Sequence, residues 1–200
     1  MTILKTSYSD NKNMTWEQAA FKSASEIWQK HSTYQSFTLK PFLDKSVQET
    51  TNLREIIDYY IKTDLYLQKI KSNIDNINKE DFTNTRTEHK FLWHAMAVNA
   101  INAASKIYPD SKIKMLDVVL TVIRKQKDYG HHNIAMFGIT GLVIRIHDKI
   151  ARAENILSKE NMQNAVPGES LYDTFLDIVG YSIIALMWLD NTFMLQLEEK

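Results

Sequence analysis

The chain contains no cysteine among its 200 residues. Disulfide bonds, thiolate zinc sites and cysteine nucleophiles are therefore excluded, and the absence is typical of a reducing compartment. The sequence also lacks an excess of either charge, because 24 basic residues balance 24 acidic ones. A neutral chain gives no general attraction to nucleic acid or to an anionic membrane. We therefore expect a cytoplasmic protein that binds neither nucleic acid nor a membrane directly.

Glycine and proline are scarce, and the five glycines all lie at or after position 130. A stretch without glycine over the first 129 residues favours long helices. Apolar residues recur at helical spacing in several segments, and no segment alternates in the manner of a strand. The sequence predicts an all-α bundle of about six helices, with a polar turn at 79–85. The predicted helices span 15–30, 52–76, 87–107, 110–129, 140–158 and 167–197, and Asp110 or Ser111 is the expected cap of the fourth.

Long hydrophobic runs are also missing. The longest, at 178–189, has about twelve residues, whereas a membrane-spanning helix needs about twenty. The first thirteen residues are polar and lack the apolar run of a signal peptide. We expect the 178–189 segment to be part of a buried core helix.

Charge is distributed unevenly along the second half of the chain. Eight basic and three acidic residues lie within 112–152, whereas eight acidic and two basic residues follow Ala153. If these segments pack as neighbouring helices, a basic surface faces an acidic one. Such an arrangement suits a phosphate group bridged to a cation.

The acidic segment contains a row of three carboxylates, Glu169, Asp173 and Asp177, spaced four residues apart. This spacing places them on one face of a helix, where neighbouring like charges repel by roughly 3 kcal/mol. A cation or a basic partner would relieve the repulsion. Alternatively, Glu169 and Asp173 only favour the helix N-terminus, which leaves Asp177 unexplained. The same face continues into the apolar run, so Asp177 should be the least solvated of the three.

The basic segment places Arg145, Asp148 and Arg152 on one face of the preceding helix, with Lys149 beside them. Two guanidinium groups can hold a phosphate bidentately while the carboxylate orients one of them or binds a metal. An exposed salt bridge between Asp148 and Arg152 is the simpler alternative. The loop before this helix contains glycines and Tyr129, whose ring offers a stacking face to a nucleobase.

Three ordered motifs carry a family resemblance over about residues 111–195. They are Lys127-Asp128-Tyr129-Gly130, then Gly141-Leu142 with Arg145-Ile146-x-Asp148-Lys149-Ile150-x-Arg152, then Glu169-Ser170-x-x-Asp173-Thr174-x-x-Asp177-Ile178-x-x-Tyr181. The chain resembles the phage and bacterial family called nucleotide modification associated domain, which is similar to the MazG-like all-α NTP pyrophosphohydrolases. The resemblance implies a helical bundle, commonly oligomeric, in which helix-borne acids hold Mg²⁺ against nucleotide phosphates. MazG-like enzymes carry Glu-x-x-Glu on the preceding helix, where this chain has Asp148 among basic residues.

The leading functional hypothesis is a Mg²⁺-dependent enzyme that cleaves an NTP or dNTP between its α and β phosphates, in the host cytoplasm if the chain is phage-encoded. Residues 111–200 would form the nucleotide-binding domain, packed with a helical region at 1–110 of unknown role, in a homo-oligomer. Two alternatives are a protein that sequesters a nucleotide without cleaving it and a structural bundle without a ligand.

Each candidate residue has an expected role in this hypothesis. Catalysis is assigned to Asp148, Asp173 and Asp177. The same three carboxylates, with Glu169, would supply the Mg²⁺ ligands. Phosphates would be held by Arg145, Lys149 and Arg152. The sugar or base would contact Asp128 and Tyr129.

Overall fold

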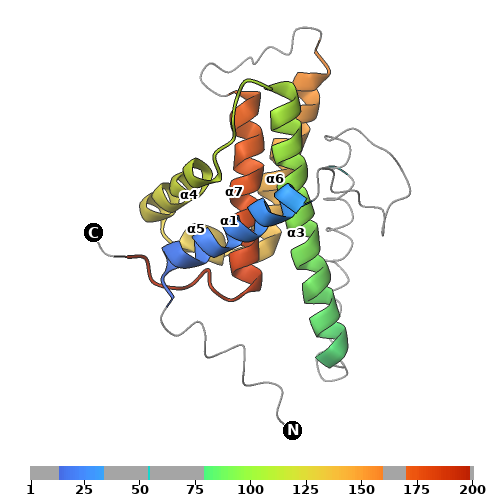
Figure 1. Ribbon diagram of the computed structural model, residues 1–200. Helices are drawn as coiled ribbons and strands as arrows, with labels where there is room; N and C mark the ends of the chain where they lie inside the picture. Colours follow the sequence, from blue (N-terminus) through green and yellow to red (C-terminus); the bar gives the residue numbers. More distant parts are fainter. Residues whose placement is uncertain (1–13, 34–53, 55–78, 160–169, 199–200) are drawn as a thin grey trace.

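A computed structural model describes residues 14–33, 54, 79–159 and 170–198 (Figure 1). The described residues form helices and no strands, which confirms the predicted all-α bundle. The predicted helix at 52–76 lies outside the described residues, apart from Arg54. The helices are α1 (Trp16–Thr33), α3 (Lys79–Ile107), α4 (Met115–Tyr129), α5 (His132–Ala135), α6 (Gly138–Leu157) and α7 (Leu171–Leu189).

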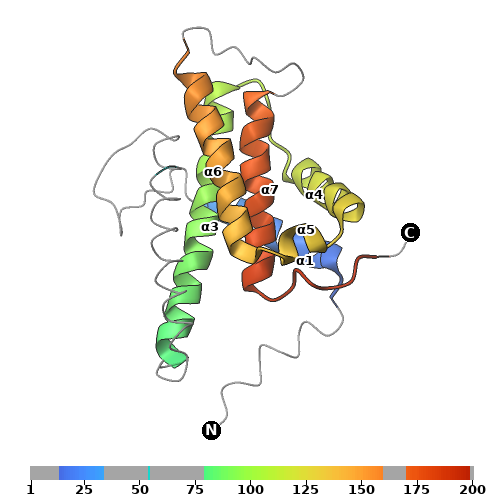
Figure 2. The same cartoon turned by 180° about the vertical axis from the view of Figure 1, so that it is seen from behind.

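Helix α7 is central, because it contacts α1, α3, α4 and α6. Helix α3 runs alongside α7, and α1 crosses this pair on one side (Figure 1). Seen from behind, α6 and α4 lie to either side of α7 (Figure 2). Helix α7 is long and apolar enough to cross a membrane by length and composition, yet 61% of that stretch is buried inside the protein. It is therefore a core helix here, as its sequence predicts.

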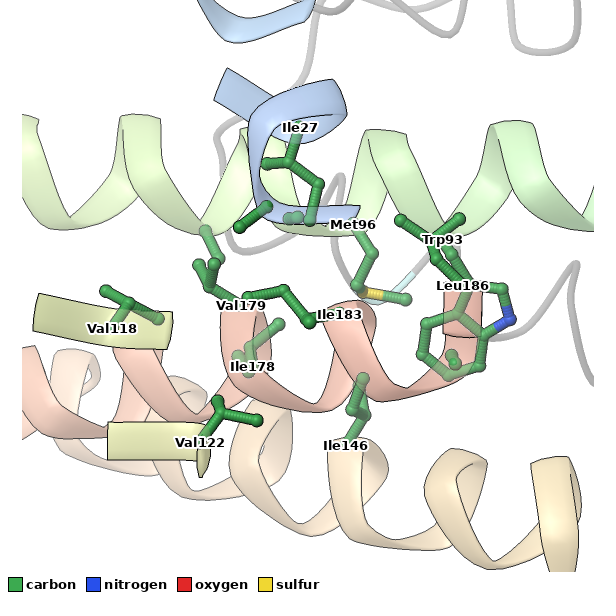
Figure 3. Close-up of a cluster of buried hydrophobic side chains, with 14 of the residues drawn as sticks. Ile27, Trp93, Met96, Val118, Val122, Ile146, Ile178, Val179, Ile183 and Leu186 are labelled. Atoms are coloured by element: carbon green, nitrogen blue, oxygen red, sulfur yellow. The ribbon is translucent and has the colours of Figure 1, made fainter. Parts of the chain in front are cut away.

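The core is built from apolar side chains of all six described helices, and Figure 3 shows the part of it that surrounds α7. Burying one such side chain stabilises a fold by roughly 1.5–3 kcal/mol, so this cluster fixes the position of α7 relative to its neighbours. Its labelled members are Ile27 of α1, Trp93 and Met96 of α3, Val118 and Val122 of α4, Ile146 of α6, and Ile178, Val179, Ile183 and Leu186 of α7.

Both ends of α7 are defined by specific interactions. At its start, the Ser170 hydroxyl accepts a hydrogen bond from the Asp173 N–H, and the Asp173 carboxylate accepts one from the Ser170 N–H. This reciprocal capping box satisfies two N–H groups that lack helical partners. At its end, α7 stops at Leu189 rather than continuing to 197, so the predicted C-terminus was wrong. Asn191 adopts a left-handed φ of 56°, which its short polar side chain tolerates.

Residues 190–198, which we call the return segment, then run back across the bundle. Phe193 is buried in the core, with only 1% of its surface exposed. The carbonyl of Gln196 accepts a hydrogen bond of 3.0 Å from the Trp16 N–H at the start of α1. Burial of Phe193 and this pairing explain why the chain turns here instead of extending α7 into solvent.

Two further helix boundaries differ from prediction. The expected turn at 79–85 is the first part of α3, because polar residues such as Lys79 and Glu80 are good helix formers and polarity alone does not end a helix. The fourth helix begins after Lys114, without a side-chain cap. Ser111 instead forms part of the turn that follows α3, in which its N–H donates to the Tyr108 carbonyl at 2.9 Å.

Candidate functional site

A groove of about 530 Å³ lies between α4, α6 and α7. Helices α4 and α7 approach closely at Gly180, where an added Cβ would lie 3.1 Å from the nearest methyl carbon of Val122. Along α7, the groove is lined by residues spaced four positions apart, including Asp173, Asp177 and Tyr181. One face of α7 therefore packs into the core, while part of the opposite face lines this groove.

The described residues that line the groove have an excess of positive charge, although the whole chain is neutral. Three aspartates line it, namely Asp117, Asp173 and Asp177. Twice as many basic side chains line it, namely Lys112, Lys114, Lys125, Arg145, Lys149 and Arg152. A concave surface with one dominant sign of charge concentrates ligands of the opposite sign. The groove is therefore suited to an anion.

Asp177 forms the centre of this charge arrangement. Its two carboxylate oxygens accept hydrogen bonds from Lys125 Nζ at 2.9 Å and from Lys149 Nζ at 2.7 Å. The lysines belong to α4 and α6, so one carboxylate of α7 connects all three helices. The sequence left open whether a cation or a basic partner balances this acid, and the structure provides two basic partners.

These ion pairs shift the protonation equilibria of the central cluster. Burial raises the pKa of Asp177, but the hydrogen bonds from Lys149 and Lys125 outweigh it and hold the pKa below the ordinary 3.8. Burial lowers the pKa of Lys125, and its hydrogen bond to Asp177 more than compensates, so the net shift is upward. Asp177 and Lys125 are thus both charged near neutral pH.

One end of the groove combines aromatic rings with hydrogen-bond donors. The Arg145 guanidinium lies 6.0 Å from the ring centre of Tyr181, within the range of a cation–π contact. The same guanidinium donates a hydrogen bond of 2.7 Å to the side-chain oxygen of Asn133. Tyr129, which is 66% exposed, follows Lys125 by one turn of α4 and lines the same groove. This end therefore offers an accessible ring, a second ring and an oriented guanidinium.

The other end lies at the start of α7. Arg152 donates a hydrogen bond of 2.8 Å to the hydroxyl of the buried Thr174. Burial raises the pKa of Tyr172, and the carboxylates of Asp173 and Asp117 raise it further. The Asp173 carboxylate also accepts hydrogen bonds from the Ser170 backbone and hydroxyl. Asp173 thus acts in the N-terminal cap, as the simpler sequence interpretation proposed.

Comparison with protein families finds a similarity, which covers much of this site. Residues 125–189 match the family model of nucleotide modification associated domain 1. This segment is similar to that family. The match confirms the resemblance predicted from the three motifs, whereas the similarity to MazG-like enzymes stays a prediction. No curated protein and no solved structure matches the chain.

The segment matched by nucleotide modification associated domain 1 runs from the middle of α4 to the end of α7. It includes the central Asp177 cluster and the Arg145–Tyr181 end of the groove. Helices α1 and α3 lie outside the match and pack against α7. The similarity is therefore concentrated on the part of the chain that forms most of the groove.

The structure brings most of the predicted site residues together. The groove is lined by Tyr129, Arg145, Lys149, Arg152, Asp173 and Asp177. Asp148 and Asp128 are exposed and do not line it. Successive residues of a helix point about 100° apart, so Asp148 turns away where Lys149 reaches Asp177. Of the predicted acidic row, Asp177 is less exposed than Asp173, as expected, and Glu169 lies outside the described residues.

The predicted magnesium site can be compared with the donors that are described. Magnesium is bound by oxygen ligands in octahedral geometry. Each oxygen of Asp177 already holds a lysine, and Asp173 is engaged in the helix cap. Within 14–33, 54, 79–159 and 170–198, no three His, Asp or Glu side chains gather as a metal site would require. The described donors thus do not fit a magnesium ion in this arrangement, and magnesium dependence stays a prediction.

Several residues of the groove were not predicted as site residues, among them Lys125, Asn133, Gly180 and Tyr181. Two of them carried a sequence signal. Lys125 belongs to the basic segment, and Tyr181 continues the face of Asp177 by one helical turn. Asn133 and Gly180 carried only an indirect one. Asn133 belongs to the loop before the helix of Arg145, and Gly180 continues the face of the acidic row, but their roles depend on contacts between residues distant in sequence.

Proposed function

We propose that the groove binds a nucleotide through its phosphates. The observation that carries this proposal is the arrangement around Asp177. Lys125 Nζ and Lys149 Nζ, from two different helices, converge on one carboxylate within a groove that is otherwise dominated by basic side chains. A phosphate offers similar oxygen acceptors and more negative charge, so it can interact with the same ammonium groups.

Further basic side chains line the groove beside the lysines that hold Asp177. Arg152 lies beside the cluster on α6, and its planar guanidinium suits bidentate contact with a phosphate. Lys112 and Lys114 line the groove next to the start of α4. A purely structural ion-pair network would require about as many acids as bases. Among the described residues that line the groove, bases outnumber acids, and this favours an added anionic ligand over a bundle without a ligand.

The type of phosphate compound is inferred from two independent features. The matched family carries a name that refers to nucleotide modification. The groove also places tyrosines 129 and 181 close to Lys125, one of the phosphate-binding lysines, where a base can stack. Together they support a nucleotide rather than inorganic phosphate or a sugar phosphate. Binding is required for cleavage as well as for sequestration, so the proposal is common to both predicted activities.

The test asks whether phosphate binding becomes stronger or weaker when the negative charge of Asp177 is removed. Replacing Asp177 with Asn removes a negative charge and leaves both lysines in place. If the groove binds phosphates directly, Asp177→Asn should bind tripolyphosphate without Mg²⁺ about tenfold more tightly. A unit charge roughly 5 Å from the phosphate changes its binding free energy by up to about 3 kcal/mol at an effective dielectric constant near 20, which is more than a tenfold gain requires. Isothermal titration calorimetry measures the affinity.

Asp190→Asn provides the matched control. Asp190 is also paired with two basic side chains, Lys90 at 2.8 Å and Arg86 at 3.4 Å, but it does not line the groove. Its replacement should leave the affinity for tripolyphosphate unchanged. Failure of both the wild type and Asp177→Asn to bind tripolyphosphate or any nucleotide would refute the proposal.

A second experiment on the same two proteins distinguishes binding from the predicted Mg²⁺-dependent cleavage. Nucleotides are incubated with the wild type and Asp177→Asn in the presence of Mg²⁺, and the products are separated by chromatography. If Asp177 is a metal ligand, its replacement abolishes turnover and any Mg²⁺-dependent gain in affinity. Tight binding without turnover in the wild type identifies a sequestering protein instead.

A further inference from the structure

At the Arg145 end of the groove, the side chains present mostly hydrogen-bond donors to a ligand, and phosphate binding does not explain this arrangement. We infer that this end selects nucleobases with a carbonyl group at purine position 6 or pyrimidine position 4, over bases with an amino group there. The selected bases are hypoxanthine, guanine, uracil and thymine, and the disfavoured bases are adenine and cytosine. The inference rests on the proposed function, because it assigns the base of the same bound nucleotide.

The first step is the orientation of Asn133. Its side-chain oxygen accepts the hydrogen bond of 2.7 Å from Arg145. An amide that presents its oxygen to a guanidinium has its NH₂ group directed elsewhere, with two hydrogen-bond donors. Asn133 is exposed and lines the groove. The ligand therefore meets a donor at this position rather than an acceptor.

The second step is that Arg145, like the NH₂ group of Asn133, offers hydrogen-bond donors to the ligand. A guanidinium has five N–H donors and no acceptor, and in the described part of the chain its hydrogen bonding is confined to Asn133. Its position over the Tyr181 ring holds it at this end of the groove. Two neighbouring side chains thus offer mostly donors, because the Asn133 oxygen is already engaged by Arg145. A carbonyl oxygen can accept from them, whereas an amino group would bring further donors against them.

The third step is the distance from the phosphate site. Tyr181 follows Asp177 by one turn of α7, and Arg145 precedes Lys149 by one turn of α6, which places both roughly 6 Å along their helices. A nucleotide lying lengthwise in the groove can thus place its phosphates at the lysines and its base at the donors. The exposed ring of Tyr129 is available for stacking, which favours all bases and leaves discrimination to the hydrogen bonds.

The experiment compares pairs of ligands that differ mainly at the discriminating group. ITP and ATP form one pair, and UTP and CTP form the other. Calorimetric titration of the wild type should give about tenfold tighter binding for ITP than for ATP, and for UTP than for CTP. Because these comparisons use the unaltered protein, the result does not depend on the folding of a variant.

A variant of Asn133 tests whether this residue causes the preference for bases with a carbonyl group. Asn133→Asp keeps the size of the side chain and an oxygen for Arg145 but replaces the NH₂ donors with a second oxygen. The ratio between the members of each pair should fall to about twofold or less. Asn155→Asp is the control, because Asn155 is an exposed residue of α6 outside the groove. It adds the same charge and should leave both ratios at their wild-type values.

The outcomes separate this inference from the proposed function. Equal affinity for both members of each pair, or a preference for ATP and CTP, overturns the base assignment and leaves phosphate binding intact. A ratio that persists in Asn133→Asp overturns the assignment to this residue. Failure of all four nucleotides and of tripolyphosphate to bind overturns the proposed function itself.

Discussion

Two aspartates, one within α7 and one at its C-terminal end, bind two basic side chains each. Asp177 accepts from Lys125 of α4 and Lys149 of α6, at 2.9 and 2.7 Å. Asp190 pairs with Lys90 and Arg86, both from α3, at 2.8 and 3.4 Å. The side chains of the two aspartates are similarly shielded, with 26% and 23% of their surface exposed. By local geometry the two clusters are close to equivalent.

Their surroundings differ. The partners of Asp190 come from a single helix, and the cluster ties α3 to the end of α7 outside the groove. The partners of Asp177 come from two helices and face a groove with four further basic side chains. The difference shows that a paired carboxylate does not define a functional site by itself. What sets the Asp177 cluster apart is a local excess of basic over acidic side chains among the described residues, next to a space that a ligand can enter.

The largest expected effect is on phosphate affinity, and it compares the loss of Lys149, which pairs with Asp177, with the loss of Lys90, which pairs with Asp190. Lys149→Ala removes a cation from the groove and leaves Asp177 more repulsive to an incoming phosphate. Affinity for tripolyphosphate should fall roughly hundredfold, which corresponds to about 3 kcal/mol. Lys90→Ala, the counterpart at Asp190, should leave the affinity unchanged. Calorimetric titration measures both, and equal losses in the two variants would contradict the distinction.

A smaller effect is expected from changing geometry at constant charge. Arg152→Lys keeps the positive charge but loses the planar pair of donors, so affinity for tripolyphosphate should fall about tenfold. Arg86→Lys makes the same exchange beside Asp190 and should have no effect. If Arg152→Lys binds within about twofold of the wild type, Arg152 contributes only diffuse charge and does not clamp a phosphate.

The smallest effect concerns stability in acid. The pKa of Asp177 is lowered on folding, so its ionised form stabilises the protein above its ordinary value of 3.8, and this contribution disappears as the pH falls through the lower folded value. At about pH 6, Asp177→Asn should lower the free energy of unfolding by about 1 kcal/mol, the size expected for a partly exposed ion pair. Near pH 3 or below, the difference from the wild type should shrink, as measured by urea denaturation. A difference that stays constant with pH would contradict the assignment.

Sequence periodicity was sufficient for much of the architecture and part of the site. Regular apolar spacing predicted the helices, and the apolar run at 178–189 predicted the central core position of α7. Four-residue spacing placed Asp173 and Asp177 on one face, and both line the groove. These features depend on residues close in sequence, for which helical geometry fixes the relative directions of side chains.

The remaining features depend on contacts between distant segments. Lys125 and Asp177 are 52 positions apart, so no local pattern predicts their ion pair. Asp148 and Lys149 are neighbours, and only the packing of α6 against α7 decides which of them meets Asp177. The end of α7 was misplaced for the same reason, because the turn at Asn191 is stabilised by the burial of Phe193 and by contacts with α1.

The return segment also has a consequence for the order of folding. The Glu198 N–H donates to a side-chain oxygen of Glu17 at 3.0 Å, across 181 positions of sequence. Together with the bond between Trp16 and Gln196, it fastens α1 to the far end of the chain. Closing so long a loop has an entropic cost that only the assembled bundle can offset. During synthesis, α1 therefore leaves the ribosome long before the residues that bind its start, and these two hydrogen bonds form only after nearly all of the described chain has been made.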